Sequence, residues 1–130
     1  MGKTVQATAF IFLWFLMLTL AGCGEMVSAG PSGVFVDSST EAFLEKSFEE
    51  TKDCTELKEG KFKDVSVIFM PSTFPCKHYK GGCSGEYVNP NLLKVGTLFV
   101  WRHEVIHYLL DLNTGDPDAA HKSTFFKTCT

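Results

Sequence analysis

Residues 101–121 read WRHEVIHYLLDLNTGDPDAAH and hold three of the four histidines in the chain. Apolar residues recur at helical spacing on nearly all sides of the segment from about residue 96 or 99 to Leu112. This pattern is typical of a buried helix. Asn113, Thr114 and Gly115 are expected to end it. The segment PDAAHKSTFF, after Asp116 as a possible N-cap, predicts a second, short helix that leads back past the first. The fold is therefore expected to form around this buried helix.

The pentapeptide HEVIH, residues 103–107, follows the H-E-x-x-H pattern. Residues four apart share one face of a helix, so the imidazoles of His103 and His107 can reach one zinc ion at about 2.0–2.1 Å. Glu104 lies one residue further round the helix, where it can act as the catalytic base toward a water molecule at the metal. Two imidazoles and a carboxylate on a buried helix would be costly without a shared partner, which favours a metal site over simple packing.

A catalytic zinc site usually has three protein ligands and one open position. His121 is the favoured third ligand, because the chain reverses after Gly115 and can return it to the helix. Asp116 and Asp118 are alternative ligands, or could accept hydrogen bonds from the outer ring N–H groups of the histidines. Weaker candidates, for stabilising an oxyanion, are His78, Tyr87 and Tyr108.

The preceding segments predict a small mixed fold. Residues 41–53 form an amphipathic pattern, with Phe43, Leu44 and Phe48 on one face, and Ser39 or Thr40 can cap this helix. VSVIFM, residues 65–70, predicts a buried strand. CKHYKGGCSGEYVNPN is expected to be a loop or hairpin, and the second half of LLKVGTLFV a strand or the first turn of the next helix. The fold class is therefore expected to be α+β.

Four cysteines follow residue 23, and an even number in a small exported domain indicates two disulfides. Three pairings are possible. The favoured one joins Cys76 to Cys83, which closes a short loop, and Cys54 to Cys129, which ties the C-terminal end to an early helix. A competing interpretation makes Cys76, His78 and Cys83 zinc ligands, although an oxidising compartment disfavours free thiolates.

The first residues have the pattern of a secretory signal. An apolar run from Ala7 to Leu20 follows Lys3 and is too short for a typical membrane-spanning helix. LAGC, residues 20–23, resembles the lipobox of bacterial lipoprotein signal peptides, in which the cysteine becomes the lipidated first mature residue. The resemblance implies a signal peptide over residues 1–22, a lipid on Cys23 and export to the cell envelope. Gly24, in place of an aspartate, favours the outer membrane in a diderm cell.

Residues 23–33 are small and polar and are expected to tether one domain, residues 34–130, to the lipid. The whole chain has 12 Lys plus Arg against 15 Asp plus Glu and a net charge of −3. No basic stripe is present, which excludes nucleic acid as an expected partner. The expected partners are a peptide or protein substrate and, through the lipid, a membrane. The expected oligomeric state is a monomer.

The segment WRHEVIHYLLDLNTGDPDAAHKSTFFKTC, residues 101–129, resembles the active-site segment of zincin metallopeptidases. More narrowly, it is similar to small bacterial lipoproteins in which HExxH is followed by T-G-D-x-D-x-x-H, an aromatic residue and a cysteine. The resemblance implies a minimal zincin-like domain with a small sheet packed on the HExxH helix. It assigns His103, His107 and His121 as zinc ligands and Glu104 as the base. The H-x-x-G-x-x-H continuation, a methionine turn and a downstream glutamate ligand, which mark better-known zincins, do not follow.

The expected function is zinc-dependent hydrolysis of peptide bonds by an exported, lipid-anchored protein. One alternative is a non-catalytic binding lipoprotein in which zinc is structural, and another is an interaction protein without metal. A fourth protein ligand would indicate the structural site, and an open position the enzyme. An extended substrate could add to an exposed strand edge, which VSVIFM or TLFV could provide.

Overall fold

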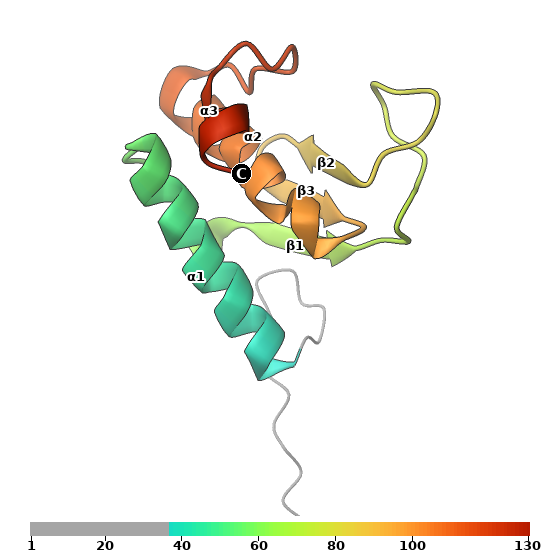
Figure 1. Ribbon diagram of the computed structural model, residues 1–130, viewed down its shortest axis with the longest axis horizontal. Helices are drawn as coiled ribbons and strands as arrows, with labels where there is room; N and C mark the ends of the chain where they lie inside the picture. Colours follow the sequence, from blue (N-terminus) through green and yellow to red (C-terminus); the bar gives the residue numbers. More distant parts are fainter. Residues whose placement is uncertain (1–36) are drawn as a thin grey trace, which may run out of the picture.

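A computed structural model of the chain describes residues 37–130. It confirms the expected α+β class, with three α-helices and a three-stranded sheet (Figure 1). The elements, in chain order, are α1 (Ser38–Thr55), the 3-10 helix η1 (Phe62–Asp64), β1 (Ser66–Phe69), β2 (Gly85–Val88), β3 (Leu92–Val95), the 3-10 helix η2 (Leu98–Val100), α2 (Trp101–Thr114) and α3 (Phe125–Thr128).

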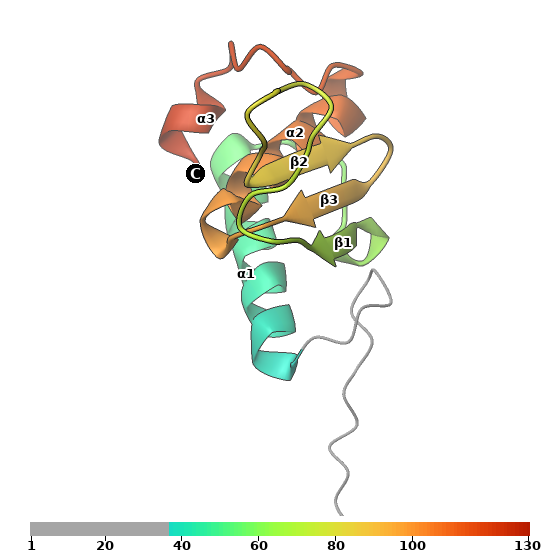
Figure 2. The same ribbon diagram turned by 90° about the vertical axis from the view of Figure 1, so that its right-hand side faces the viewer.

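The sheet has the strand order β1-β3-β2, so β3 is central and both other strands are edges (Figure 2). β1 runs parallel to β3, with Val67 opposite Leu93. β2 and β3 form an antiparallel hairpin, with Tyr87 opposite Leu93. Because β2 has only one strand neighbour, its outer edge is left to contacts with other elements, and α2 is the helix that packs against it.

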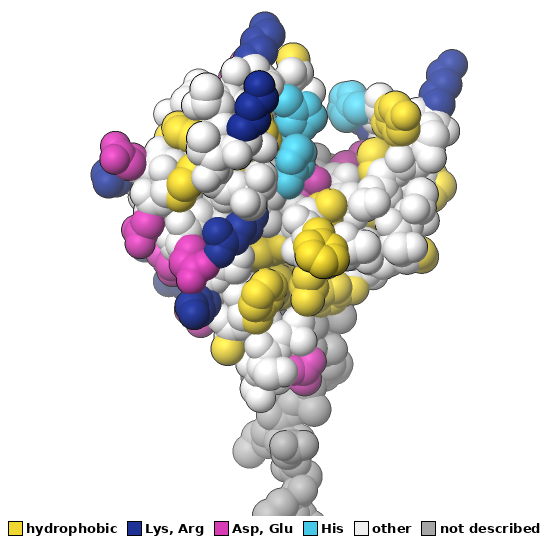
Figure 3. Space-filling model, viewed as in Figure 1, with side chains coloured by type: hydrophobic (Ala, Val, Ile, Leu, Met, Phe, Trp, Pro, Cys, Tyr) yellow, Lys and Arg dark blue, Asp and Glu magenta, His cyan; other side chains and the backbone are white. Residues whose placement is uncertain are grey.

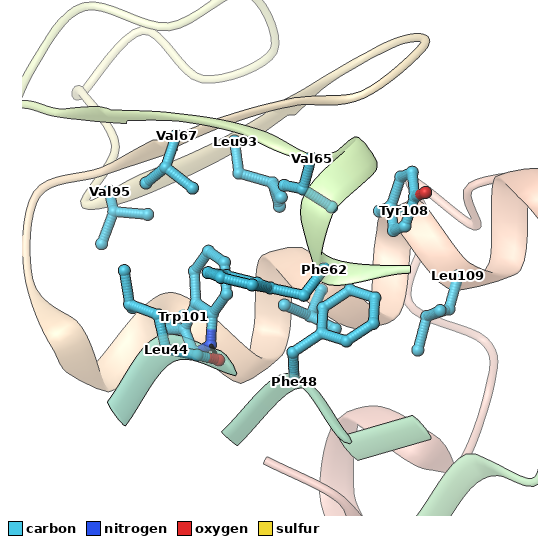
Figure 4. Packing of buried hydrophobic residues seen from close by; sticks show 11 residues of the cluster. Leu44, Phe48, Phe62, Val65, Val67, Leu93, Val95, Trp101, Tyr108 and Leu109 are labelled. Atoms are coloured by element: carbon cyan, nitrogen blue, oxygen red, sulfur yellow. Dashed lines mark hydrogen bonds between the residues drawn. The ribbon is translucent and has the colours of Figure 1, made fainter. Parts of the chain in front are cut away.

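The hydrophobic core lies between one face of the sheet and the two long helices (Figure 4). Trp101 at the start of α2 is completely buried, and its Nε1–H donates to the carbonyl oxygen of Leu44 in α1 at 3.2 Å. Other core side chains are Phe48 from α1, Phe62 from η1, Val65 and Val67 near β1, Leu93 and Val95 from β3, and Val105, Tyr108 and Leu109 from α2. This packing holds α2 against the sheet and α1.

Helix α1 is longer than predicted, and its capping residue was predicted incorrectly. Asp37, rather than Ser39 or Thr40, is the N-cap, and its carboxylate accepts from the N–H of Thr40 at 2.9 Å. Leu44 and Phe48 are buried as predicted, whereas the Phe43 side chain is exposed. Each helical residue turns the side chain by about 100°, so Phe43 lies beside the buried stripe rather than within it.

The segment between α1 and α2 also differs in part from its prediction. Val67 is buried, but Ile68, which points to the opposite face of the sheet, and Phe69, which ends the strand, are partly exposed. The segment expected to be a loop or hairpin contains β2. Residues 97–100, predicted to be either a strand or the first turn of the next helix, contain the 3-10 helix η2. TLFV therefore provides no strand edge, and the edge beside α2 belongs to β2.

Both favoured disulfides are present, Cys54–Cys129 and Cys76–Cys83. The first ties α1 to the end of α3, and the second closes a loop between β1 and β2. Because a sulfur atom in a disulfide cannot act as a thiolate ligand, the alternative zinc site at Cys76, His78 and Cys83 is wrong for this structure.

The predicted signal peptide, the lipidated Cys23 and the whole predicted tether, residues 23–33, lie outside the described residues. Within residues 37–130, no helix has the length and apolar character needed to cross a membrane.

Candidate metal centre

Helix α2 carries the first two histidines on one face, as the H-E-x-x-H spacing predicts. The ring centroids of His103 and His107 are 5.0 Å apart. The neighbouring side chains Val105, Ile106 and Leu109 are fully buried, so the helix cannot roll without disrupting the core. The core packing of α2 therefore fixes the direction in which both imidazoles point.

His121 reaches this face from a loop, and the helix predicted for PDAAHKSTFF is wrong except at its end, where α3 begins at Phe125. Asp116 does not cap a helix, because no helix begins directly after it; its Oδ1 accepts from the N–H of Asp118 at 2.8 Å. The Asp118 carboxylate accepts from the N–H groups of Lys122 at 3.0 Å and Ser123 at 2.6 Å. Asp118 and His121 both have positive φ, 53° and 54°, which a helix does not allow.

The ring nitrogens of the three histidines converge. The Nε2 atom of His121 lies 2.9 Å from Nε2 of His103 and 3.1 Å from Nε2 of His107. One ligand atom from each of the three residues falls within 4.8 Å of the others. The structure thus brings together the three histidines that the sequence predicts as zinc ligands.

The protonation of this group suits a cation. Nδ1 of His107 lies 2.6 Å from the carbonyl oxygen of Pro117, and a carbonyl only accepts, so Nδ1 carries the proton and Nε2 presents a lone pair. Burial, followed by the neighbouring histidines, lowers the pKa of His103 to about 4, and burial also lowers the pKa of His107. Neutral imidazoles are the form that binds a metal.

The donor set fits zinc. Two nitrogens bound tetrahedrally at about 2.0–2.1 Å would be roughly 3.3 Å apart. The observed separations of 2.9 and 3.1 Å are within a few tenths of an ångström of that value. Three neutral imidazoles are also a common ligand set for catalytic zinc.

Phe126 of α3 covers the histidine cluster and was missed by the sequence analysis as a site residue. Its ring centroid lies 4.9 Å from that of His103, 4.6 Å from His107 and 4.7 Å from His121. The disulfide at Cys129 anchors the short helix that carries it. The only sequence signal was the aromatic residue before the last cysteine.

Glu104 lies beside the cluster without joining it, and only 5% of its surface is exposed. The backbone N–H of Tyr87 faces its carboxylate and acts to lower its pKa. Burial is the larger effect and raises the pKa of Glu104 to about 8. A carboxyl group whose pKa lies near neutrality is suited to taking and returning a proton.

The histidines and Glu104 line a cavity of about 710 Å³. Figure 3 shows the hollow, with histidine side chains on its walls. The disulfide loop contributes Cys76, His78, Tyr79 and Cys83, and η2 contributes Phe99, whose side chain is 96% exposed. The cavity is large enough to hold part of a substrate next to the three histidines.

Of the three weaker candidates for stabilising an oxyanion, two line the cavity and one does not. His78 lines the cavity, whereas Tyr108 is buried in the core. Tyr87 lines the cavity too, but its hydroxyl donates to Asp111 Oδ2 at 2.6 Å. That hydrogen bond and burial, which is the larger cause, raise the pKa of Tyr87. Its hydroxyl is therefore already engaged.

Comparisons with protein-family models, curated proteins and solved structures give no match to this chain.

Proposed function

We propose that this chain is a zinc-dependent peptidase of the zincin type. The observation that carries the proposal is the convergence of three imidazole nitrogens at an open cavity, with the Glu104 carboxylate beside them. This combination joins metal affinity to a group that can transfer protons, and it does so at a place that substrate can reach.

The histidines and Glu104 have different roles in this proposal. His103, His107 and His121 hold Zn²⁺, which when bound supplies a Lewis acid that polarises a carbonyl group and lowers the pKa of water. Glu104 takes a proton from the attacking water molecule and later delivers it to the leaving amine. The buried position of Glu104 keeps bulk water from competing for that proton.

The cavity favours catalysis over a purely structural zinc. Structural zinc sites are closed by four protein ligands, whereas catalytic sites keep one position open. Within residues 37–130, no cysteine or carboxylate joins the three histidines as a further member of the group. The side of the group that faces the cavity is available to substrate.

The test combines metal analysis with peptide hydrolysis. Purified protein is loaded with zinc and offered a broad library of peptides, beside the variants Glu104→Gln and His107→Ala. We expect one zinc per chain in the wild type and in Glu104→Gln, but hydrolysis lowered by roughly 10²–10⁴-fold in the latter. His107→Ala should lose both metal and activity. A zinc-loaded wild type that cleaves no peptide, with four protein ligands by X-ray absorption spectroscopy, would establish the structural alternative.

We also propose that the protein is exported and anchored through a lipid on Cys23. Support comes from the lipobox pattern and from the two disulfides, which persist in oxidising compartments. Cells fed a fatty-acid analogue should label the wild type and not Cys23→Ser. An unlabelled wild type contradicts the anchor and leaves the peptidase proposal unaffected.

A further inference from the structure

The position of the Glu104 carboxylate is set by the edge strand β2. An ideal Cβ placed on Gly85 would overlap Oε1 of Glu104 and lie 2.9 Å from its Cδ, so the carboxylate rests directly on the strand backbone. The N–H of Tyr87 faces the same carboxylate. Any shift of β2 relative to α2 would therefore move or release Glu104.

The hairpin ladder leaves the N–H of Tyr87 free for this role. The N–H of Gly96 donates to the carbonyl of Ser84 at 2.7 Å, and hydrogen-bonded pairs alternate along an antiparallel ladder. The pair formed by Glu86 and Lys94 is therefore hydrogen-bonded across the two strands. The pair formed by Tyr87 and Leu93 is not, so its N–H groups point away from the partner strand. The N–H of Tyr87 points away from β3, toward the outer edge and Glu104.

Asp111 fastens this edge to α2. Its Oδ2 accepts the hydroxyl hydrogen of Tyr87 at 2.6 Å, and the side-chain amide of Asn89 donates to the same oxygen. Hydrogen bonds to a carboxylate are stronger than those between neutral groups. Asp111 follows Glu104 by seven residues, or about two helical turns, so both lie on the same side of α2.

We infer that Asp111 is a positioning residue for Glu104, acting through the side chain and backbone of Tyr87. Glu104 faces the backbone N–H of Tyr87, and Asp111 accepts from the hydroxyl of the same residue. These contacts hold α2 and β2 in a fixed position relative to each other next to Glu104, the proposed base. This inference rests on the proposed function, in which Glu104 transfers protons.

The experiment compares Asp111→Ala and Tyr87→Phe with a matched control. Asn113→Ala is the control, because Asn113 also ties α2 to another segment, accepting from the N–H of Glu59 at 2.9 Å and donating to its carbonyl at 3.1 Å. All three variants should lose some thermal stability. Only the first two should lower kcat, by roughly 10- to 100-fold as expected for a misplaced catalytic group, with zinc content and KM nearly unchanged. The double variant should be little worse than either single one.

A second readout does not depend on activity. In the zinc-loaded wild type, the Tyr87 amide should be protected from hydrogen exchange, and Glu104→Ala and Asp111→Ala should both remove that protection while Asn113→Ala keeps it. Unprotected wild-type Tyr87, or Asp111→Ala with wild-type protection and kcat, overturns the inference. If the wild type hydrolyses no peptide yet Tyr87 loses protection in Asp111→Ala, the proposed function fails while the positioning role stands.

Discussion

Nδ1 of His107 lies 2.6 Å from the backbone carbonyl oxygen of Pro117, which joins the middle of α2 to the loop that carries His121. This single contact fixes the ring orientation of His107 and directs its Nε2 lone pair at the other histidines. The shape of the loop therefore controls two of the three candidate ligands at once.

The first prediction concerns Asp118, whose carboxylate accepts two backbone N–H groups and so holds the loop in shape. Asp118→Ala should let both the Pro117 carbonyl and His121 move, and zinc affinity should fall by about 10- to 100-fold. Competition with a chelator measures the change. Glu49→Ala, on the exposed face of α1, removes the same charge and should leave affinity unchanged. Equal affinities for the two variants would rule out this role of Asp118.

The second prediction separates the candidate third ligands. His121→Ala should release zinc and lower the melting temperature of the zinc-loaded protein, because metal binding adds to folding free energy. Asp116→Ala should keep one zinc per chain, since Asp116 binds the N–H of Asp118 and is not part of the histidine group. Metal analysis and thermal unfolding with and without zinc provide the comparison. Wild-type zinc affinity in His121→Ala would mean that another residue completes the site.

The sequence predicted the histidine group because its main signal is local. The spacing of His103 and His107 places two imidazoles on one face of any helix, and the glycine at position 115 predicts the chain reversal that returns His121. The disulfides were predictable as well, since four cysteines allow few pairings and the close spacing of Cys76 and Cys83 favours one of them.

The parts that could not be predicted depend on the backbone or on distant contacts. The Pro117 carbonyl has no side-chain signature, so its contact with His107 is invisible in the sequence. The helix predicted after Asp116 failed because Asp118 binds the backbone N–H groups of Lys122 and Ser123, in competition with helical hydrogen bonds. The link from Asp111 to Tyr87 spans 24 residues and requires the strand pairing to be known first.

The third prediction ranks the two disulfides by stability. Cys54 and Cys129 are separated by 75 residues, and Cys76 and Cys83 by 7. In the chain-entropy model, removing the long-range bond by a double alanine substitution should cost about 4 kcal/mol, and removing the short one about 2 kcal/mol. Urea unfolding of the zinc-loaded proteins measures both costs. A larger loss from the short bond would show that native contacts of the cavity wall, rather than chain entropy, dominate.

The last prediction uses two glycines to separate activity from stability. A methyl group on Gly85 would overlap Oε1 of Glu104 and lie 2.8 Å from Cγ2 of Val100. The end of the glutamate side chain can move more easily than the strand, so Gly85→Ala should displace Glu104, the proposed base. Peptide hydrolysis should fall by roughly 10- to 100-fold while zinc binding is kept.

Gly115→Ala is the matched control for this substitution. Gly115 ends α2 with φ at 76°, and no atom lies within 4 Å of an added Cβ. Alanine there should cost about 1–2 kcal/mol of stability through backbone strain and leave kcat of the folded, zinc-loaded protein unchanged. Steady-state kinetics and urea unfolding of both variants make the comparison. If Gly85→Ala retains wild-type kcat, the close approach of β2 to Glu104 does not govern catalysis. If both variants lose activity in proportion to stability, the effect of Gly85 is on folding alone.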